Sequence, residues 1–172
     1  VPAAISGTRV YLLLADGRVL ASALDTGRAQ WAFTMKGPPK SVLALEDSVF
    51  VGGAEKYFYC LRASNGRVRW RWRTGGAAAG TPVVDRKRVY FVALDNLLRS
   101  LNRGNGHLQW QQGLATRPRS GPVFSGGLLL VSGLEGVFGF QVVDGSQAGA
   151  LDVPGELAAP PFFVSPAAAA VS

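Results

Sequence analysis

The chain has 172 residues, of which 48% are hydrophobic, so it is long enough for one domain with a real core and too short for a large multidomain enzyme. Only 17% of the residues are charged, while 22 are glycine and 10 are proline. This composition excludes an intrinsically disordered chain and a coiled coil, and it favours an all-β protein of short strands joined by turns.

The formal net charge of +7 is distributed unevenly along the chain. Residues 1–55 carry equal numbers of bases and acids, residues 56–119 carry 13 bases and two acids, and residues 120–172 carry four acids and no base. A basic middle and an acidic end predict one electropositive sector, facing an acidic partner, an anionic lipid surface or a nucleic acid.

Cysteine and histidine are too few for several kinds of site. Cys60 is the sole cysteine and His107 the sole histidine, which excludes an intrachain disulfide and makes a zinc site improbable. Cys60 follows the aromatic stretch 57–59, a context that favours a buried, inert thiol. His107 falls in an expected turn, where a solvated side chain is the ordinary interpretation.

A repeat with a period of about 40 residues organises the chain. Asp-Thr-Gly-Arg-Ala-Gln-Trp at 25–31 recurs as Ser-Asn-Gly-Arg-Val-Arg-Trp at 64–70 and as Gly-Asn-Gly-His-Leu-Gln-Trp at 104–110. A weaker fourth copy has Asp144 and Gly145 but carries Gly149 in place of the tryptophan. Apolar runs that begin with the pairs Val10-Tyr11, Val49-Phe50, Val89-Tyr90 and Leu128-Leu129 follow the same period.

Each repeat is expected to form four antiparallel strands. Proline opens the first strand, as at 82–84, 122–124 and 161–163, and the apolar run forms the second. A tight turn such as Asp16-Gly17 or Asp95-Asn96 leads into the third, and the strand with the tryptophan is the fourth. Four short strands per repeat are the pattern of a β-propeller blade.

The triplicated Gly-x-x-x-Trp motif, with its preceding Thr or Asn, resembles the PQQ-like (quinoprotein-type) β-propeller repeat family. The resemblance implies that Trp31, Trp70 and Trp110 dock between neighbouring blades, and it leaves the docking of the fourth blade in doubt at Gly149. The expected blades are 2–40, 41–81, 82–121 and 122–160, with the first strand of a fifth at 161–164 and a linker or tail at 165–172.

About four blades are half of the seven or eight with which members of this family usually close. Three arrangements remain open: a fragment of a longer chain, two chains that complete one ring, and a closed ring of four blades. The fragment is favoured, because residues 165–170 resemble a linker rather than a sealed terminus. The absence of an initiator methionine also indicates a processed or excised chain.

The most basic stretch is the alternating sequence at 67–73. Strand geometry places Arg67, Arg69, Arg71 and Arg73 on one face and the apolar residues between them on the other. The charges then either protect an outer edge strand from pairing or form a stripe that binds a partner. Arg86, Lys87 and Arg88 lie one blade later and extend the candidate partner-binding set.

These features predict a binding scaffold rather than an enzyme. A quinone site of the usual kind needs an adjacent cysteine pair, which one cysteine cannot supply, so no cofactor, metal or small-molecule substrate is expected. Nucleic acid is not expected either, because blade docking accounts for the tryptophans. A resemblance to the lipoprotein propeller of the outer-membrane β-barrel assembly machinery implies an acidic or membrane-associated protein partner in the periplasm or at the outer membrane.

Two other functions stay open at this point. The chain could be part of a PQQ-dependent dehydrogenase whose catalytic loops lie in other blades, or the sensor or adaptor part of a larger surface protein. Self-association that completes the propeller ring is a further expectation.

Overall fold

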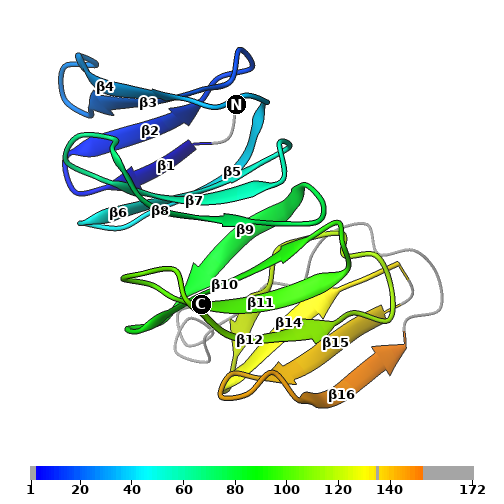
Figure 1. Ribbon diagram of the computed structural model, residues 1–172. Helices are drawn as coiled ribbons and strands as arrows, with labels where there is room; N and C mark the ends of the chain where they lie inside the picture. The colour runs from blue at the N-terminus through cyan, green and yellow to red at the C-terminus, as the bar shows by residue number, and fades with distance from the viewer. Residues whose placement is uncertain (1–2, 135, 153–172) are drawn as a thin grey trace, which may run out of the picture.

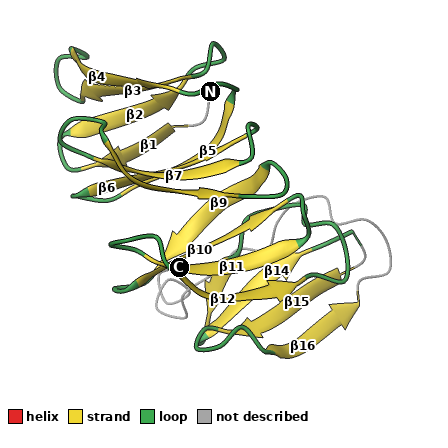
Figure 2. Ribbon diagram, viewed as in Figure 1, coloured by secondary structure: helices red, strands yellow, loops and turns green. Residues whose placement is uncertain are grey.

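A computed structural model describes residues 3–134 and 136–152 of the chain, and all regular secondary structure in this part is β (Figure 2). The expected fifth-blade strand at 161–164 and the tail at 165–172 lie outside the described residues. Among the residues described, no helix has the length and apolar character that crossing a membrane requires.

In the described part of the chain, sixteen strands form four separate sheets, each with four antiparallel strands in chain order. Blade 1 contains β1 (Ala3–Ser6), β2 (Arg9–Leu13), β3 (Arg18–Ala23) and β4 (Ala29–Thr34), and blade 2 contains β5 (Pro39–Ala44), β6 (Ser48–Gly53), β7 (Tyr57–Arg62) and β8 (Val68–Arg73). Blade 3 contains β9 (Ala78–Val84), β10 (Arg88–Ala93), β11 (Leu97–Asn102) and β12 (Leu108–Gly113), and blade 4 contains β13 (Val123–Ser125), β14 (Leu128–Ser132), β15 (Gly136–Gln141) and β16 (Gln147–Asp152).

The sheets follow one another like the blades of a fan (Figure 1), which confirms the expected all-β propeller architecture. The first strands differ in detail from the expectation. β5 begins at Pro39 and β9 at Ala78, before the expected blade starts at 41 and 82. Pro82 lies inside β9, next to a register shift in the pairing with β10, where a missing N–H is tolerated.

The register of blade 4 corrects one sequence-based equivalence. Tyr90 on β10 pairs with Ser100, and the residue at the matching position of blade 4, Leu130, pairs with Gly139. Leu129-Leu130, and not Leu128-Leu129, is therefore the counterpart of Val89-Tyr90. Three consecutive leucines look alike in a hydrophobicity pattern, so only the strand pairing distinguishes them.

The hydrophobic core lies between the blades. We call the side of a blade that faces the preceding blade its leading face, and the opposite side its trailing face. Each of three buried clusters combines the trailing face of one blade with the leading face of the next. Between blades 2 and 3, for example, the rings of Phe58 and Phe91 stack with their centroids 4.0 Å apart. The blades therefore depend on their neighbours for burial of apolar surface.

Candidate interaction surface

The three repeated tryptophans lie at equivalent positions on the fourth strands of blades 1–3. Each indole N–H donates a hydrogen bond to a backbone carbonyl of the next blade. The acceptors are Ala63 for Trp31 at 2.8 Å, Arg103 for Trp70 at 2.9 Å and Val142 for Trp110 at 3.1 Å. Trp70 is buried, whereas Trp31 and Trp110 are half-buried. These contacts tie consecutive blades together.

Each indole packs against the repeated glycine of the next blade. Gly66, Gly106 and Gly145 have φ of 69°, 75° and 77°, in the region that favours glycine. A Cβ built on them would lie 2.5 Å from Trp31, 2.7 Å from Trp70 and 2.5 Å from Trp110, respectively. Glycine is thus required both by the turn and by the ring. The repeat pattern showed the glycine and the tryptophan but not that they meet across different blades.

In blades 2 and 3, a carboxylate in the turn between the second and third strands accepts a hydrogen bond from the segment that connects the preceding blade. Glu55 accepts the backbone N–H of Lys36, and Asp95 accepts that of Gly75, both at 2.7 Å. Asp95 also forms a largely buried ion pair with Arg99 at 2.6 Å. Burial raises the pKa of the Asp95 carboxyl, but the bonds from Arg99 and Gly75 outweigh it and hold that pKa below its usual value.

Three of the four arginines expected in a stripe are exposed. Arg67 lies in the turn before β8, and Arg71 and Arg73 lie on β8 itself. The guanidinium carbon of Arg71 is 5.1 Å from the centroid of the Tyr57 ring, a cation–π distance. Arg67, Arg71 and Arg73 therefore place three positive charges on the surface of blade 2.

Arg69 departs from the expected stripe. Its guanidinium pairs with Asp47 at 3.0 Å and donates to the Ser48 hydroxyl at 3.2 Å, and its side chain is only 27% exposed. The cause is a register shift between β7 and β8 at Cys60 and Leu61, which breaks the simple alternation that the sequence suggested.

The second basic group also divides into exposed and structural members. Arg86 and Lys87 are exposed in the turn between β9 and β10. Arg88 instead donates to the carbonyls of Val142 and Val143 at 2.8 and 3.0 Å, so it joins blade 3 to blade 4. We use the term basic surface for the exposed residues Arg67, Arg71, Arg73, Arg86 and Lys87, which are spread over β8, the turn before it and the turn between β9 and β10.

Two carboxylates of blades 2 and 3, Asp85 and Asp47, form hydrogen bonds with residues of their own blades. Asp85 accepts the backbone N–H groups of Lys87 and Arg88 and the Tyr90 hydroxyl, all at 2.6–2.7 Å. Asp47 is paired with Arg69. Burial raises the pKa of both carboxyls, but these hydrogen bonds lower it more, so the pKa of each lies below its usual value. Both stay ionised at neutral pH while engaged in local bonds.

Cys60 and His107, each the sole residue of its type, show no features of a reactive site in the part of the chain that the structure describes. Cys60 is buried, and burial raises the pKa of its thiol to about 11, which suppresses the reactive thiolate. His107 is exposed in the turn between β11 and β12. Within residues 3–134 and 136–152, no three His, Cys, Asp or Glu side chains group closely enough to hold a metal ion.

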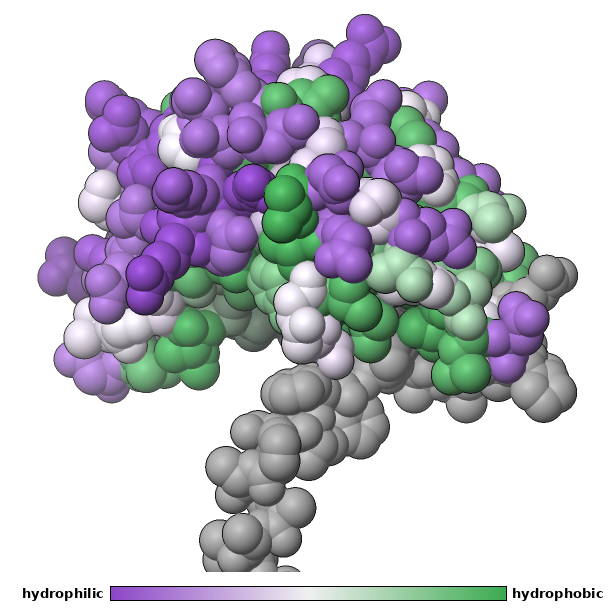
Figure 3. Space-filling model, turned by 90° about the horizontal axis from the view of Figure 1, so that it is seen from below, coloured by the Kyte–Doolittle hydropathy of each residue, from purple (hydrophilic) through white to green (hydrophobic). Residues whose placement is uncertain are grey.

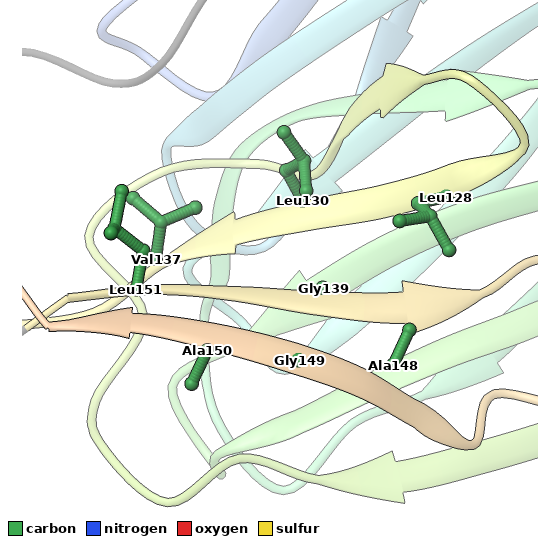
Figure 4. A pocket seen from close by; sticks show the side chains of 8 residues that line it. All are labelled: Leu128, Leu130, Val137, Gly139, Ala148, Gly149, Ala150 and Leu151. Atoms are coloured by element: carbon green, nitrogen blue, oxygen red, sulfur yellow. The ribbon is translucent and has the colours of Figure 1, made fainter.

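A hollow of about 350 Å³ lies on the trailing face of blade 4 (Figure 4). Leu128, Leu130, Val137 and Leu151 line it, together with Gly139 and Gly149. Gly149 pairs with Gly139 as Trp110 pairs with Ser100, so the hollow lies where the earlier blades carry an indole. The space-filling view shows hydrophobic residues gathered along one border of a largely hydrophilic face (Figure 3).

Comparison with known proteins decides the family. The sequence profile of the family described as outer membrane protein assembly factor BamB matches residues 15–159. The chain belongs to the BamB family. This membership confirms the resemblance to quinoprotein-type repeats that the Gly-x-x-x-Trp motif indicated.

Individual members of the BamB family are similar to the chain over part of their length. The outer membrane protein assembly factor BamB of Yersinia pestis is 28% identical over 147 residues, which are 76% of this chain and 37% of that protein. The factor of the same name from Moranella endobia is 24% identical over 125 residues, 66% of this chain and 32% of that protein. The chain thus spans about a third of the length of these relatives.

Two solved structures share the fold. The crystal structure of BamB from Moraxella catarrhalis superposes with a TM-score of 0.78 at 18% identity, over 88% of this chain and 49% of that one. The computationally designed Ika8 protein gives a TM-score of 0.81 at 13% identity, over 90% of this chain and 49% of that one. The described blades correspond to about half of each structure.

Proposed function

We propose that this chain is a non-enzymatic protein-binding scaffold of the cell envelope that takes part in outer-membrane protein assembly. Family membership supports a role in outer-membrane protein assembly. The matching family and the relatives from Yersinia pestis and Moranella endobia are all named outer membrane protein assembly factors. The chain works outside the cytoplasm, in the periplasm and at the outer membrane, where such assembly takes place.

The basic surface is the observation that supports binding of a protein partner. Its five bases are exposed on blades 2 and 3, and the nearby carboxylates Asp47 and Asp85 are engaged in local bonds. An acidic region of a partner would meet exposed positive charge there, and exposed charges at an interface act mainly on association rate and on choice of partner.

A binding experiment with a defined probe tests this function. The immobilised chain is exposed to outer-membrane assembly machinery purified from a strain that lacks its own BamB, and in parallel to an unrelated outer-membrane complex of similar acidity. The proposal predicts retention of the assembly machinery and not of the unrelated complex. Equal retention of both would show that charge alone attracts them and would contradict a specific scaffold.

The enzymatic alternative is tested on the same preparation. The chain is mixed with PQQ and calcium, and absorbance and dye reduction with alcohols or sugars are recorded. A scaffold takes up no stoichiometric quinone and shows no turnover. Stoichiometric uptake with dye reduction would identify a quinoprotein dehydrogenase fragment and overturn the proposal.

A further inference from the structure

A polar hollow of about 460 Å³ lies where the turn between β3 and β4 of blade 1 meets the turn between β7 and β8 of blade 2. The described residues that line it include no Asp or Glu. Its five polar side chains are those of Arg9, Thr26, Arg28, Gln30 and Ser64. Each of them has a hydrogen-bond donor, and two of them carry a positive charge. The composition of the hollow therefore favours an anion.

Arg9 is held in place by groups that do not neutralise its charge. Its Nε donates to Oε1 of Gln30 at 2.5 Å. It also bonds the hydroxyl of the buried Tyr11: burial raises the pKa of Tyr11, while the charge of Arg9 and this hydrogen bond lower it by less. Both partners of Arg9 are uncharged at neutral pH, so its guanidinium group is positioned and still carries its full charge.

Arg28 brings a second charge from the turn between β3 and β4, where its side chain is exposed. Among the residues that the structure describes, no carboxylate forms an ion pair with Arg9 or Arg28. Asp25 belongs to the same turn but is not among the residues that line the hollow. The two guanidinium groups thus repel each other, and an anion bound between them would remove that repulsion.

The corresponding bases of blades 2 and 3 are already engaged. Arg88, the counterpart of Arg9 at the start of the second strand, donates to two carbonyls of blade 4. In blade 2 the base is Arg69, which pairs with Asp47 at 3.0 Å. Thr8 stands in blade 1 where blade 2 has Asp47. Blade 1 therefore has the base without the acid.

We propose that this hollow is a binding site for a phosphate group, carried by inorganic phosphate, a soluble phosphate ester or a lipid headgroup. Guanidinium groups bind phosphate oxygens through strong, charge-assisted hydrogen bonds, and the hydroxyls of Thr26 and Ser64 supply further donors. The donors come from both walls of the hollow, which suits a tetrahedral anion better than a planar carboxylate. No residue of the basic surface takes part, so the site is separate from the function proposed above.

An NMR titration of the ¹⁵N-labelled chain with inorganic phosphate, at neutral pH and constant ionic strength, tests the site. The backbone amide signals of Thr26, Arg28 and Ser64 should shift saturably, and chloride or acetate should not reproduce the shifts. Arg28→Gln should weaken the affinity about tenfold, as expected for the loss of a hydrogen bond from a charged group. Arg28 is exposed and forms no ion pair in the described part of the chain, so this variant should stay folded, which circular dichroism checks.

The matched control is Arg67→Gln, which removes the same charge at the corresponding position of blade 2, after Gly66 instead of Gly27. This variant should bind phosphate with nearly the wild-type affinity. Equal losses in Arg28→Gln and Arg67→Gln, or shifts that chloride reproduces, would show general attraction of anions and overturn the proposal. Absence of saturable shifts at the three amides, together with absence of vesicle binding, would also overturn it.

Sedimentation with vesicles identifies the source of the phosphate group. Binding to phosphatidylglycerol vesicles, and not to phosphatidylcholine vesicles, that Arg28→Gln reduces more than Arg67→Gln would assign the site to lipid headgroups. Binding of inorganic phosphate without sedimentation would assign it to soluble phosphate compounds. Sedimentation that both variants reduce equally would mean that lipid binding does not use the hollow, and without phosphate-induced shifts it would contradict the site.

Discussion

The indole of Trp70 rests on Gly106 of the next blade, where a Cβ would lie 2.7 Å from ring carbon Cδ2, and its N–H donates to the Arg103 carbonyl at 2.9 Å. One side chain thus connects two sheets that share no strand pairing. The contact recurs at Trp31 and Trp110. It stabilises the packing of neighbouring blades, each of which is a single sheet that cannot bury its apolar faces alone.

Replacing Trp70 with alanine should lower the free energy of unfolding by about 3–5 kcal/mol, the usual range for a large aromatic in a core. Trp31→Ala should cost less, because Trp31 is half-buried whereas Trp70 is only 8% exposed. Urea denaturation followed by circular dichroism measures both. A loss below about 1 kcal/mol for Trp70→Ala would mean that the docking contact contributes little.

The glycine beneath each indole gives a matched pair of substitutions. Gly27→Ala and Gly106→Ala both place a side chain at similar positive φ, 67° and 75°, which costs about 1–2 kcal/mol. Gly106→Ala also forces a Cβ into the Trp70 ring, so it should be more destabilising by about 1–3 kcal/mol. Equal losses in urea denaturation would show that the indole does not occupy the site.

The Asp95–Arg99 pair should make stability depend on pH in the acid range. Because the folded pKa of Asp95 lies below its usual value, its contribution is fully present above the unfolded pKa, about 3.9, and is lost as the pH falls through the folded pKa. Asp95→Asn should cost about 2 kcal/mol at pH 7, the middle of the range for hydrogen bonds to charged groups.

Urea denaturation at intervals between neutral and strongly acidic pH measures this dependence. The difference between wild type and Asp95→Asn should shrink as the pH falls through the folded pKa. A difference that stays constant over the whole range would mean that ionisation of Asp95 does not contribute to stability.

The Cys60 thiol should be inaccessible in the folded protein. It is fully buried, and its pKa is raised to about 11, so a thiol reagent at pH 8 should label it only after unfolding. The labelling rate should rise along the denaturation curve together with the loss of circular dichroism signal. Fast labelling without denaturant would show that blades 2 and 3 separate readily.

Sequence reasoning was strongest where the repeat itself carries the information. The spacing of Gly27, Gly66 and Gly106 with their tryptophans predicted both the propeller architecture and the residues that join its blades. Such signals are local in sequence and recur several times. Consistency among copies therefore compensates for the weakness of any one of them.

The remaining features depend on contacts between segments far apart in the chain. Arg69 pairs with Asp47 in the turn between β5 and β6, and Arg88 bonds carbonyls of blade 4, so alternation along one strand could not separate them from the exposed bases. The contact between each indole and the glycine of the next blade likewise joins segments far apart in the chain.

The most direct test of the scaffold account is the rate at which the chain associates with purified outer-membrane assembly machinery at low and high salt. Changing Arg67, Arg73, Arg86 and Lys87 together to glutamine should slow association and flatten its salt dependence, with stability nearly unchanged, because exposed charges are screened over about 8 Å at physiological ionic strength. The matched control removes four exposed bases from the first 40 residues, Arg18, Arg28, Lys36 and Lys40, and should retain most of the wild-type rate. Equal slowing by both sets would mean that net charge rather than the basic surface guides association, and no binding by the wild-type chain would contradict the account.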